Sequence, residues 1–244
     1  MSTQQDTPTS PTAAEPTPPE TTSGREALGL LLALVLLTVV YYHGDPRGWG
    51  LAGPDNPALG QWLQRYSRFV WFGLNFVLLF GVPALVIRVG WRERLSDYGL
   101  GLGQPRLWDL LAPALLMIPV VVWASRLPSL QAYYPLVPLA REGVGGFLLS
   151  ATGWLVYFFA WEFFFRGFLL HLLLRRGPAL AILVQTIPFV MMHYGKPEAE
   201  SWGAILAGLA LGFMAWRGRS MLSCWLLHWA VAVSLDLLVV VWRL

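Results

Sequence analysis

A few ionisable side chains lie inside long apolar stretches of this 244-residue sequence, and they are its candidates for chemistry. Ionisable groups in such surroundings are costly, and by default they mark function. A carboxylate and two imidazoles can surround a water molecule and activate it, with or without a metal ion. The predicted site residues are Glu162 and Arg166 in WEFFFRGFLL, His193 at the end of PFVMMH, and His228 in CWLLHWAVAV.

Glu162 and Arg166 are four residues apart, so on a helix they share one face and can form an ion pair. The guanidinium would keep the carboxylate ionised, and an ionised carboxylate near a substrate amide can act as general base on water. The alternative is a structural ion pair that ties two helical turns together. Apolar residues would serve a span in lipid better, which favours the functional interpretation.

Both histidines also have a structural alternative. His193 ends an apolar run that Gly195 and Pro197 stop, and a histidine at a helix end commonly binds the last carbonyls. A histidine inside a membrane helix, such as His228, often hydrogen-bonds to a neighbouring helix. Asp236 lies eight residues after His228 and is predicted to share its polar stripe.

The remaining polar residues carry weaker predictions. Glu198 and Glu200 are predicted to be solvated loop charges, with Glu200 alternatively approaching the site from the loop. His171, beside two arginines, is predicted to lie at an interface. Cys224 is the single cysteine; it cannot form an internal disulfide and is predicted to be a small buried hydrophobe. HExxH and GxSxG motifs are absent, so neither a zincin nor a serine hydrolase of the nucleophile-elbow type is indicated.

The elements that must position these residues are predicted to be membrane-spanning helices. A span needs about 20 mostly apolar residues to cross about 30 Å of hydrocarbon. The predicted fold class is therefore all-α, a polytopic transmembrane helical bundle of about seven spans, with six or eight as alternatives. The first, fifth and sixth segments are short and need not cross fully. The segments are Ala27–Tyr42, Phe69–Ile87, Leu107–Trp123, Val144–Leu174, Pro178–His193, Trp202–Trp216 and Met221–Trp242.

Three regions follow from this division of the chain. Residues 1–25 are rich in Thr and Pro and are predicted to be a disordered tail, because they cannot bury enough apolar surface to offset their ordering entropy. Residues 26–143 hold the N-terminal spans and connectors, and residues 144–244 hold the catalytic helical core. In the Gly- and Pro-rich loop His43–Arg68, the segment Leu59–Tyr66 could form a short interfacial helix.

Composition places the chain in the membrane class. Apolar residues make up 56% and charged residues 13% of the sequence, against about a quarter charged in soluble domains. The net charge of +3 is spread along the chain, which predicts contact with the lipid bilayer and no nucleic-acid partner. More arginines fall in the loops on the N-terminal side. The positive-inside rule then predicts an integral protein of a bacterial inner (cytoplasmic) membrane with a cytoplasmic N-terminus.

Three motifs in order resemble those of a known family. WEFFFR, FVMMH and HWAVA are similar to the EExxxR, FxxxH and HxxxN motifs of the CAAX-protease and bacteriocin-processing family of intramembrane endopeptidases, related to the type II CAAX prenyl endopeptidase. The resemblance covers about residues 92–242. The WEFFFRG version is similar to the myxosortase-like bacterial branch. Trp161 stands where the family has its first glutamate, and Ala232 stands where it has asparagine.

The resemblance implies an intramembrane endopeptidase that hydrolyses a peptide bond near the C-terminus of a membrane-associated protein or peptide. Glu162 with His193 would activate water, His228 would polarise the scissile carbonyl, and Arg166 would orient Glu162. The cofactor is left open: either a divalent metal such as zinc, held by Glu162, His193 and His228, or none. A catalytically inactive membrane scaffold or peptide-binding partner is the alternative that Trp161 and the missing asparagine support. A small transporter is a weaker alternative, because neither an inverted repeat nor a pair of broken helices is visible.

Overall fold

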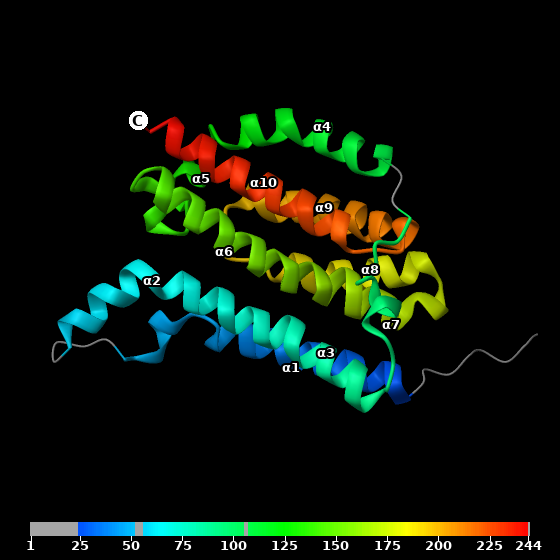
Figure 1. The fold of residues 1–244 in the computed structure, drawn as a ribbon. Helices are drawn as coiled ribbons and strands as arrows, with labels where there is room; N and C mark the ends of the chain where they lie inside the picture. Colours follow the sequence, from blue (N-terminus) through cyan, green and yellow to red (C-terminus); the bar gives the residue numbers. More distant parts are fainter. Residues whose placement is uncertain (1–23, 52–55, 105–106, 244) are drawn as a thin grey trace, which may run out of the picture.

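The computed structural model describes residues 24–51, 56–104 and 107–243, and every regular element in these ranges is helical. The predicted tail lies outside the described residues, except for Gly24 and Arg25, which begin the first helix. The α-helices, drawn in Figure 1, are α1 Gly24–His43, α2 Pro57–Asn75, α3 Val82–Leu85, α4 Leu107–Ala124, α5 Pro128–Tyr133, α6 Val144–Glu162, α7 Leu170–Leu173, α8 Pro178–Met191, α9 Glu198–Gly218 and α10 Leu222–Val241.

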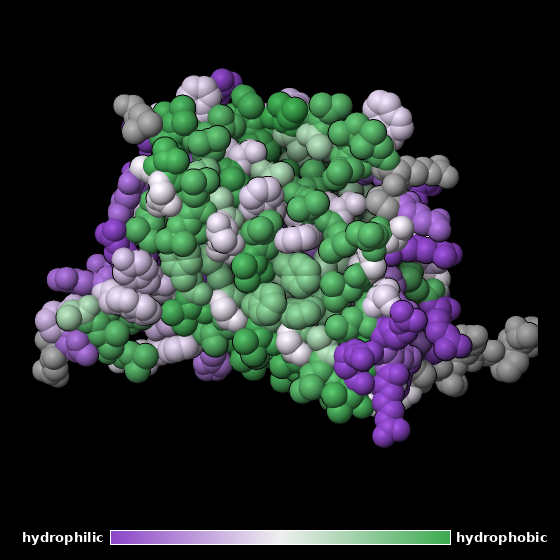
Figure 2. Space-filling model, viewed as in Figure 1, coloured by the Kyte–Doolittle hydropathy of each residue, from purple (hydrophilic) through white to green (hydrophobic). Residues whose placement is uncertain are grey.

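Six helical segments of the described residues are long and apolar enough to cross a membrane, and α8 is a shorter apolar helix beside them. Together they correspond to the seven predicted segments, which confirms the all-α transmembrane bundle. The helices run roughly parallel (Figure 1), and Figure 2 shows an apolar belt around their middle with hydrophilic side chains at the two ends. A bilayer matches this distribution, because hydrocarbon covers the belt and headgroups meet the ends.

The second span is longer than predicted. Helical structure runs without interruption over Pro57–Gly90, so the short interfacial helix expected at Leu59–Tyr66 is instead the first part of this span. Asn56 caps its start by accepting a hydrogen bond from Leu59 N at 3.1 Å, and Pro57 occupies the first turn. Pro83, which lacks an N–H group, does not end the helix, because a π-helical turn at Phe76–Gly81 shifts the bonding pattern just before it.

A second π-helical turn, Phe163–Leu169, follows α6 directly after Glu162. Such turns widen the helix and release carbonyl groups, and they are frequent at functional sites. His171 binds two of these carbonyls through Nδ1, at 3.0 Å from Arg166 O and 2.9 Å from Gly167 O. The predicted interfacial histidine is therefore half-buried and supports the turn that carries Arg166.

The helices α8 and α9 pack closely through small residues. A Cβ atom at Gly208 would lie 2.6 Å from Thr186 Cγ2, and one at Gly212 would lie 2.8 Å from Gln185 Nε2. Gln185 Nε2 also donates to Gly208 O at 2.9 Å, across the two helices. Small residues four apart let helix backbones approach in membranes, where lipid offers no hydrophobic driving force. This contact fixes the start of α9 relative to the end of α8.

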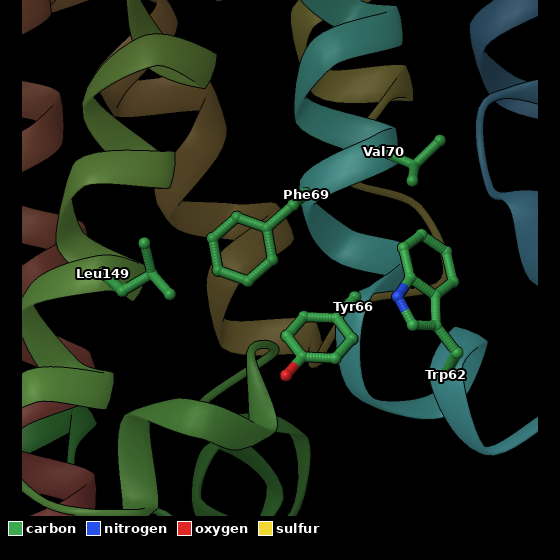
Figure 3. Close-up of a pocket in the computed structure, with 5 residues that line it drawn as sticks. All are labelled: Trp62, Tyr66, Phe69, Val70 and Leu149. Carbon is green, nitrogen blue, oxygen red and sulfur yellow. The ribbon is translucent and has the colours of Figure 1, made fainter.

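The surface between α2 and α6 carries a shallow apolar depression (Figure 3). Its lining residues are Trp62, Tyr66, Phe69, Val70 and Leu149. The only polar side-chain groups among them belong to Trp62 and Tyr66, so the depression offers no carboxylate or imidazole for chemistry. It therefore belongs to the lipid-facing surface.

Candidate active site

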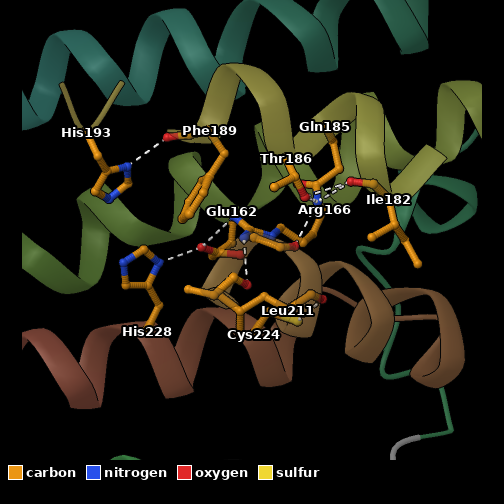
Figure 4. A network of polar contacts seen from close by, with 12 residues as sticks. Glu162, Arg166, Ile182, Gln185, Thr186, Phe189, His193, Leu211, Cys224 and His228 are labelled. Atoms are coloured by element: carbon orange, nitrogen blue, oxygen red, sulfur yellow. Dashed lines mark hydrogen bonds and ion pairs between the residues drawn. The ribbon is translucent and has the colours of Figure 1, made fainter. Parts of the chain in front are cut away.

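Glu162 is the centre of a buried polar cluster made by three helices (Figure 4). Its side chain is 0% exposed, at the last residue of α6. The Oε1 atom lies 3.2 Å from Arg166 Nη1 and 2.6 Å from His228 Nδ1. The Oε2 atom is buried and has no hydrogen-bond partner among the described residues. The carboxylate is thus held from two sides by positively polarised groups.

Arg166 is also 0% exposed and is held by more than the ion pair. Its Nη2 atom donates to Ala207 O of α9 at 3.5 Å, and its guanidinium carbon lies 4.1 Å from the centre of the Phe189 ring. A guanidinium over an aromatic face is stabilised by the ring quadrupole. The predicted contact between Glu162 and Arg166 is therefore present, and it fixes the carboxylate within the bundle.

His228 reaches Glu162 from α10. An ionised carboxylate only accepts, so the 2.6 Å contact requires a proton on Nδ1 of the imidazole. The ring lies 4.1 Å from the Phe158 ring, measured between centroids, which restricts its orientation. The side chain remains 17% exposed, more than that of Glu162. His228 thus connects the buried carboxylate to the less buried part of the site.

His193 lies in the turn directly after α8, and it does not bind Glu162. Its Nδ1 atom lies 2.7 Å from Phe189 O, so Nδ1–H donates to this carbonyl and Nε2 carries a lone pair. The imidazole is 5% exposed, and burial favours the uncharged form of such a ring. The centre of the Phe189 ring lies 4.8 Å from that of His193 and 6.1 Å from that of His228.

Glu200 was predicted to be a solvated loop charge, with an approach to the site from the loop as the alternative. The structure shows the alternative. Glu200 is not a solvated loop charge, because its side chain is 21% exposed and carries three polar contacts. Lys196 Nζ lies 2.7 Å from Oε1, Tyr134 Oη donates to Oε2 at 2.7 Å, and His193 Nε2 lies 4.0 Å from Oε1. Glu198, by contrast, is exposed as predicted.

Of two other predicted polar residues, Asp236 lies outside this cluster, whereas Cys224 lies beside it (Figure 4). Asp236 is 2% exposed and accepts a hydrogen bond from Trp154 Nε1 at 3.0 Å, so it does not line a stripe with His228 at the site. Cys224 is 0% exposed and its Sγ atom lies 3.2 Å from Leu211 O, in agreement with a small buried residue.

The predicted metal ligands do not converge. Among the described residues, His, Cys, Asp and Glu side chains form no group of three that could hold a metal ion. The Nδ1 atoms of His228 and His193 contact Glu162 Oε1 and a backbone carbonyl, which leaves Nε2 as the one donor nitrogen of each ring. A zinc site needs at least three protein donors that face one point about 2 Å away, and the described residues hold no such group.

The helix α8 is short for a membrane span. It has 14 residues and is about 21 Å long, which is less than the hydrocarbon thickness of about 30 Å. The turn after it holds His193, and Glu200 lies in the first turn of α9. The expectation that the fifth segment need not cross fully is in line with this length.

A bundle of apolar helices around a buried glutamate, an arginine and two imidazoles defines an integral membrane protein with a polar site inside the bundle. Residues 143–234 match the family model described as type II CAAX prenyl endopeptidase Rce1-like. This match confirms the predicted resemblance of this part of the chain to that family. The matched residues contain the cluster of Glu162, Arg166, His193 and His228. No match was found among curated proteins or among solved structures.

Proposed function

We propose that this protein is an intramembrane endopeptidase that hydrolyses a peptide bond near the C-terminus of a membrane-associated protein or peptide. The observation that carries the proposal is the contact of a fully buried carboxylate with an imidazole on another span, Glu162 Oε1 to His228 Nδ1 at 2.6 Å. The printed name of the matching family, a prenyl endopeptidase, supports the substrate class. The position of His193, in the turn after the short helix α8, supports cleavage near the membrane boundary.

The geometry supports different roles for the two imidazoles: His228 binds the scissile carbonyl oxygen, and His193 binds the attacking water. Glu162 binds Nδ1–H of His228, so the carboxylate stabilises a protonated ring whose Nε2–H can donate to the scissile carbonyl oxygen. Arg166 holds the Glu162 carboxylate in place. His193 offers a lone pair on Nε2, and such a lone pair can bind the attacking water. Glu162 was predicted to act with His193; among the described contacts its partner is His228.

The proposal also includes the orientation in the membrane. The start of α1 at Gly24 and the loop 91–104 lie at one end of the bundle, and the turn after α8 lies at the other. With a cytoplasmic N-terminus, the site is reached from the outer side of the membrane. In a Cys224→Ala background, a cysteine at Gly48 should react with an impermeant maleimide in intact cells, whereas one at Ser96 should react only after permeabilisation. The reverse pattern would invert the orientation.

The function is tested by co-expression with tagged candidate substrates that carry a C-terminal apolar helix with a basic tail, or a CAAX-like end. The wild type should cut at least one of them, while Glu162→Gln and His193→Ala should lose about 100-fold or more in rate. Glu198→Gln is the matched control, since this exposed carboxylate is bound only by Trp202 Nε1 among the described residues. Equal cleavage by Glu162→Gln and wild type would refute the site assignment.

An inactive membrane scaffold is the second candidate function, and Trp161 is the observation that favours it. Trp161 fills the position of the family's first glutamate and is 4% exposed, packed against Phe189 and His193 at centroid distances of 6.1 and 6.2 Å. A scaffold would bind a membrane peptide without cutting it. Absence of cleavage by the wild type, together with unchanged peptide binding by Glu162→Gln, would support this candidate over the protease.

A further inference from the structure

Glu200 is bound by two groups from different parts of the chain. Tyr134, at the end of α5, donates to Oε2, and Lys196, in the turn before α9, binds Oε1, each at 2.7 Å. Burial and the Glu200 charge raise the pKa of Tyr134, which therefore stays a hydrogen-bond donor. These contacts fix the carboxylate in position. Such fixation is expected of a group that must hold another molecule.

The Oε1 atom of Glu200 lies 4.0 Å from His193 Nε2, which is too far for a direct hydrogen bond. Both atoms are acceptors, because Nδ1 of His193 carries the ring proton. One water molecule can donate to both at about 2.8 Å each, with roughly a right angle at its oxygen. The imidazole is 5% exposed and the carboxylate is 21% exposed, so the two acceptors lie between the buried part of the site and its surface.

We propose that Glu200 is the carboxylate that, together with His193, binds and deprotonates the hydrolytic water. The proposal rests on the endopeptidase function above and names the residue that performs one of its steps. Glu200 comes from the first turn of α9, whereas the resemblance places the corresponding carboxylate on the span of Glu162. In this chain that position is Trp161, whose Nε1 atom is buried without a hydrogen-bond partner among the described residues.

The proposed step is balanced within the site. The water oxygen attacks the scissile carbonyl carbon while one water proton moves to Glu200 Oε1 and the other stays hydrogen-bonded to His193 Nε2. The carbonyl oxygen becomes the oxyanion, which His228 Nε2–H stabilises. The C–N bond then breaks, and the leaving amine takes the proton from Glu200. No oxidant, reductant or co-reactant other than water is needed.

Glu162 is less suited to this step than Glu200. Its Oε1 atom is bound by Arg166 and His228, its Oε2 atom is buried, and the side chain is 0% exposed. The Glu200 side chain is 21% exposed and lies next to the His193 imidazole. Lys196 shares Oε1, and its side chain is 26% exposed, so it can move aside when water binds.

The test compares cleavage by Glu200→Gln, Glu200→Ala and the control Glu198→Gln in the assay described above. Glu200→Gln should keep the fold, since an amide can still bind Tyr134, but should lower kcat about 100-fold or more with little change in KM. Added formate should restore part of the activity of Glu200→Ala, because a small carboxylate can occupy the vacated place. Glu198→Gln should match the wild type.

Three outcomes would overturn the proposal, and they are distinguishable. If Glu200→Gln cuts like the wild type while Glu162→Gln does not, Glu200 has no such role and the endopeptidase function stands. If Glu200→Gln and Glu200→Ala lose activity in proportion to lost folded protein and formate restores nothing, Glu200 is structural. If the wild type cuts no candidate, the function and this inference fall together.

Discussion

Replacing Arg166 by Met should destabilise the protein strongly, because it leaves a charge buried without its partner. Both side chains of the pair are 0% exposed, and Arg166 Nη1 lies 3.2 Å from Glu162 Oε1. At an effective dielectric constant of about 20, two unit charges at this distance attract by about 5 kcal/mol. Breaking a buried pair by removing one member typically costs about 3–5 kcal/mol. We expect about 3 kcal/mol for Arg166→Met, since His228 still binds the carboxylate.

The double variant Glu162→Gln/Arg166→Met should recover most of this loss, because neither charge remains. Replacing both members of a buried ion pair by neutral groups of similar size is often neutral or stabilising. The measurement is the free energy of unfolding, obtained by denaturant titration in detergent micelles. The wild type, Arg166→Met, Glu162→Gln and the double variant together form a double-mutant cycle. Peptide cleavage should be lost in all three variants.

Two results would refute this reasoning. If the double variant is as unstable as Arg166→Met, the loss comes from packing against Phe189 and not from the unpaired carboxylate. If the double variant is stable and also cleaves, the ion pair is structural and Glu162 is not required for catalysis. Arg65→Met is the control, because Arg65 pairs with Glu142 at the surface, with 47% and 42% of the side chains exposed. It should leave the unfolding transition unchanged.

Three further predictions test the support of the site, its pH dependence and its cofactor. Gly208→Leu should separate α8 from α9, since a Cβ there already lies 2.6 Å from Thr186 Cγ2, and should lower both the melting temperature and cleavage; Gly203→Leu, with open space around it, should change neither. The hydrogen bond from Arg25 lowers the pKa of Glu93, so this contact stabilises the fold above the carboxyl's ordinary pKa. Its contribution should be lost as pH falls through the lowered value, and Glu93→Gln should remove that part of the pH dependence of unfolding. Dialysis against a chelator should leave cleavage unchanged; a loss that zinc alone restores would contradict the donor geometry described above.

The spans and the contact between Glu162 and Arg166 could be predicted from the sequence, because both follow from local patterns. Apolar runs of about 20 residues fix the number of spans, and the i,i+4 spacing of Glu162 and Arg166 predicts their contact. The start of the helix over Pro57–Gly90 was missed because the Gly, Pro and Asp residues of His43–Arg68 indicated a loop. A π-helical turn that accommodates a proline has no simple sequence pattern.

The role of Glu200 could not be predicted, because it depends on contacts between distant segments. Tyr134 lies 66 residues before Glu200, and only the packing of α8 against α9 brings the first turn of α9 to His193. A glutamate beside Lys196 and Glu198 in a Gly- and Pro-containing turn is typical of a solvated loop. The sequence did place two carboxylates, Glu198 and Glu200, a few residues after His193. This proximity indicated that a glutamate of this loop could approach His193, but it did not show which of the two.

Trp161 has two opposite interpretations, and the structure gives a physical reason to choose between them. A large apolar ring in place of a carboxylate would end catalysis if no other carboxylate could reach His193. Glu200 does reach it from the neighbouring helix, at 4.0 Å from Nε2. Trp161 meanwhile packs on His193, Phe189 and Phe165, and so contributes to the burial that favours the uncharged imidazole. The His193 imidazole can bind water together with Glu200 of α9. A carboxylate at position 161, on the span of Glu162, is not needed for this. The substitution at position 161 is therefore compatible with an active enzyme.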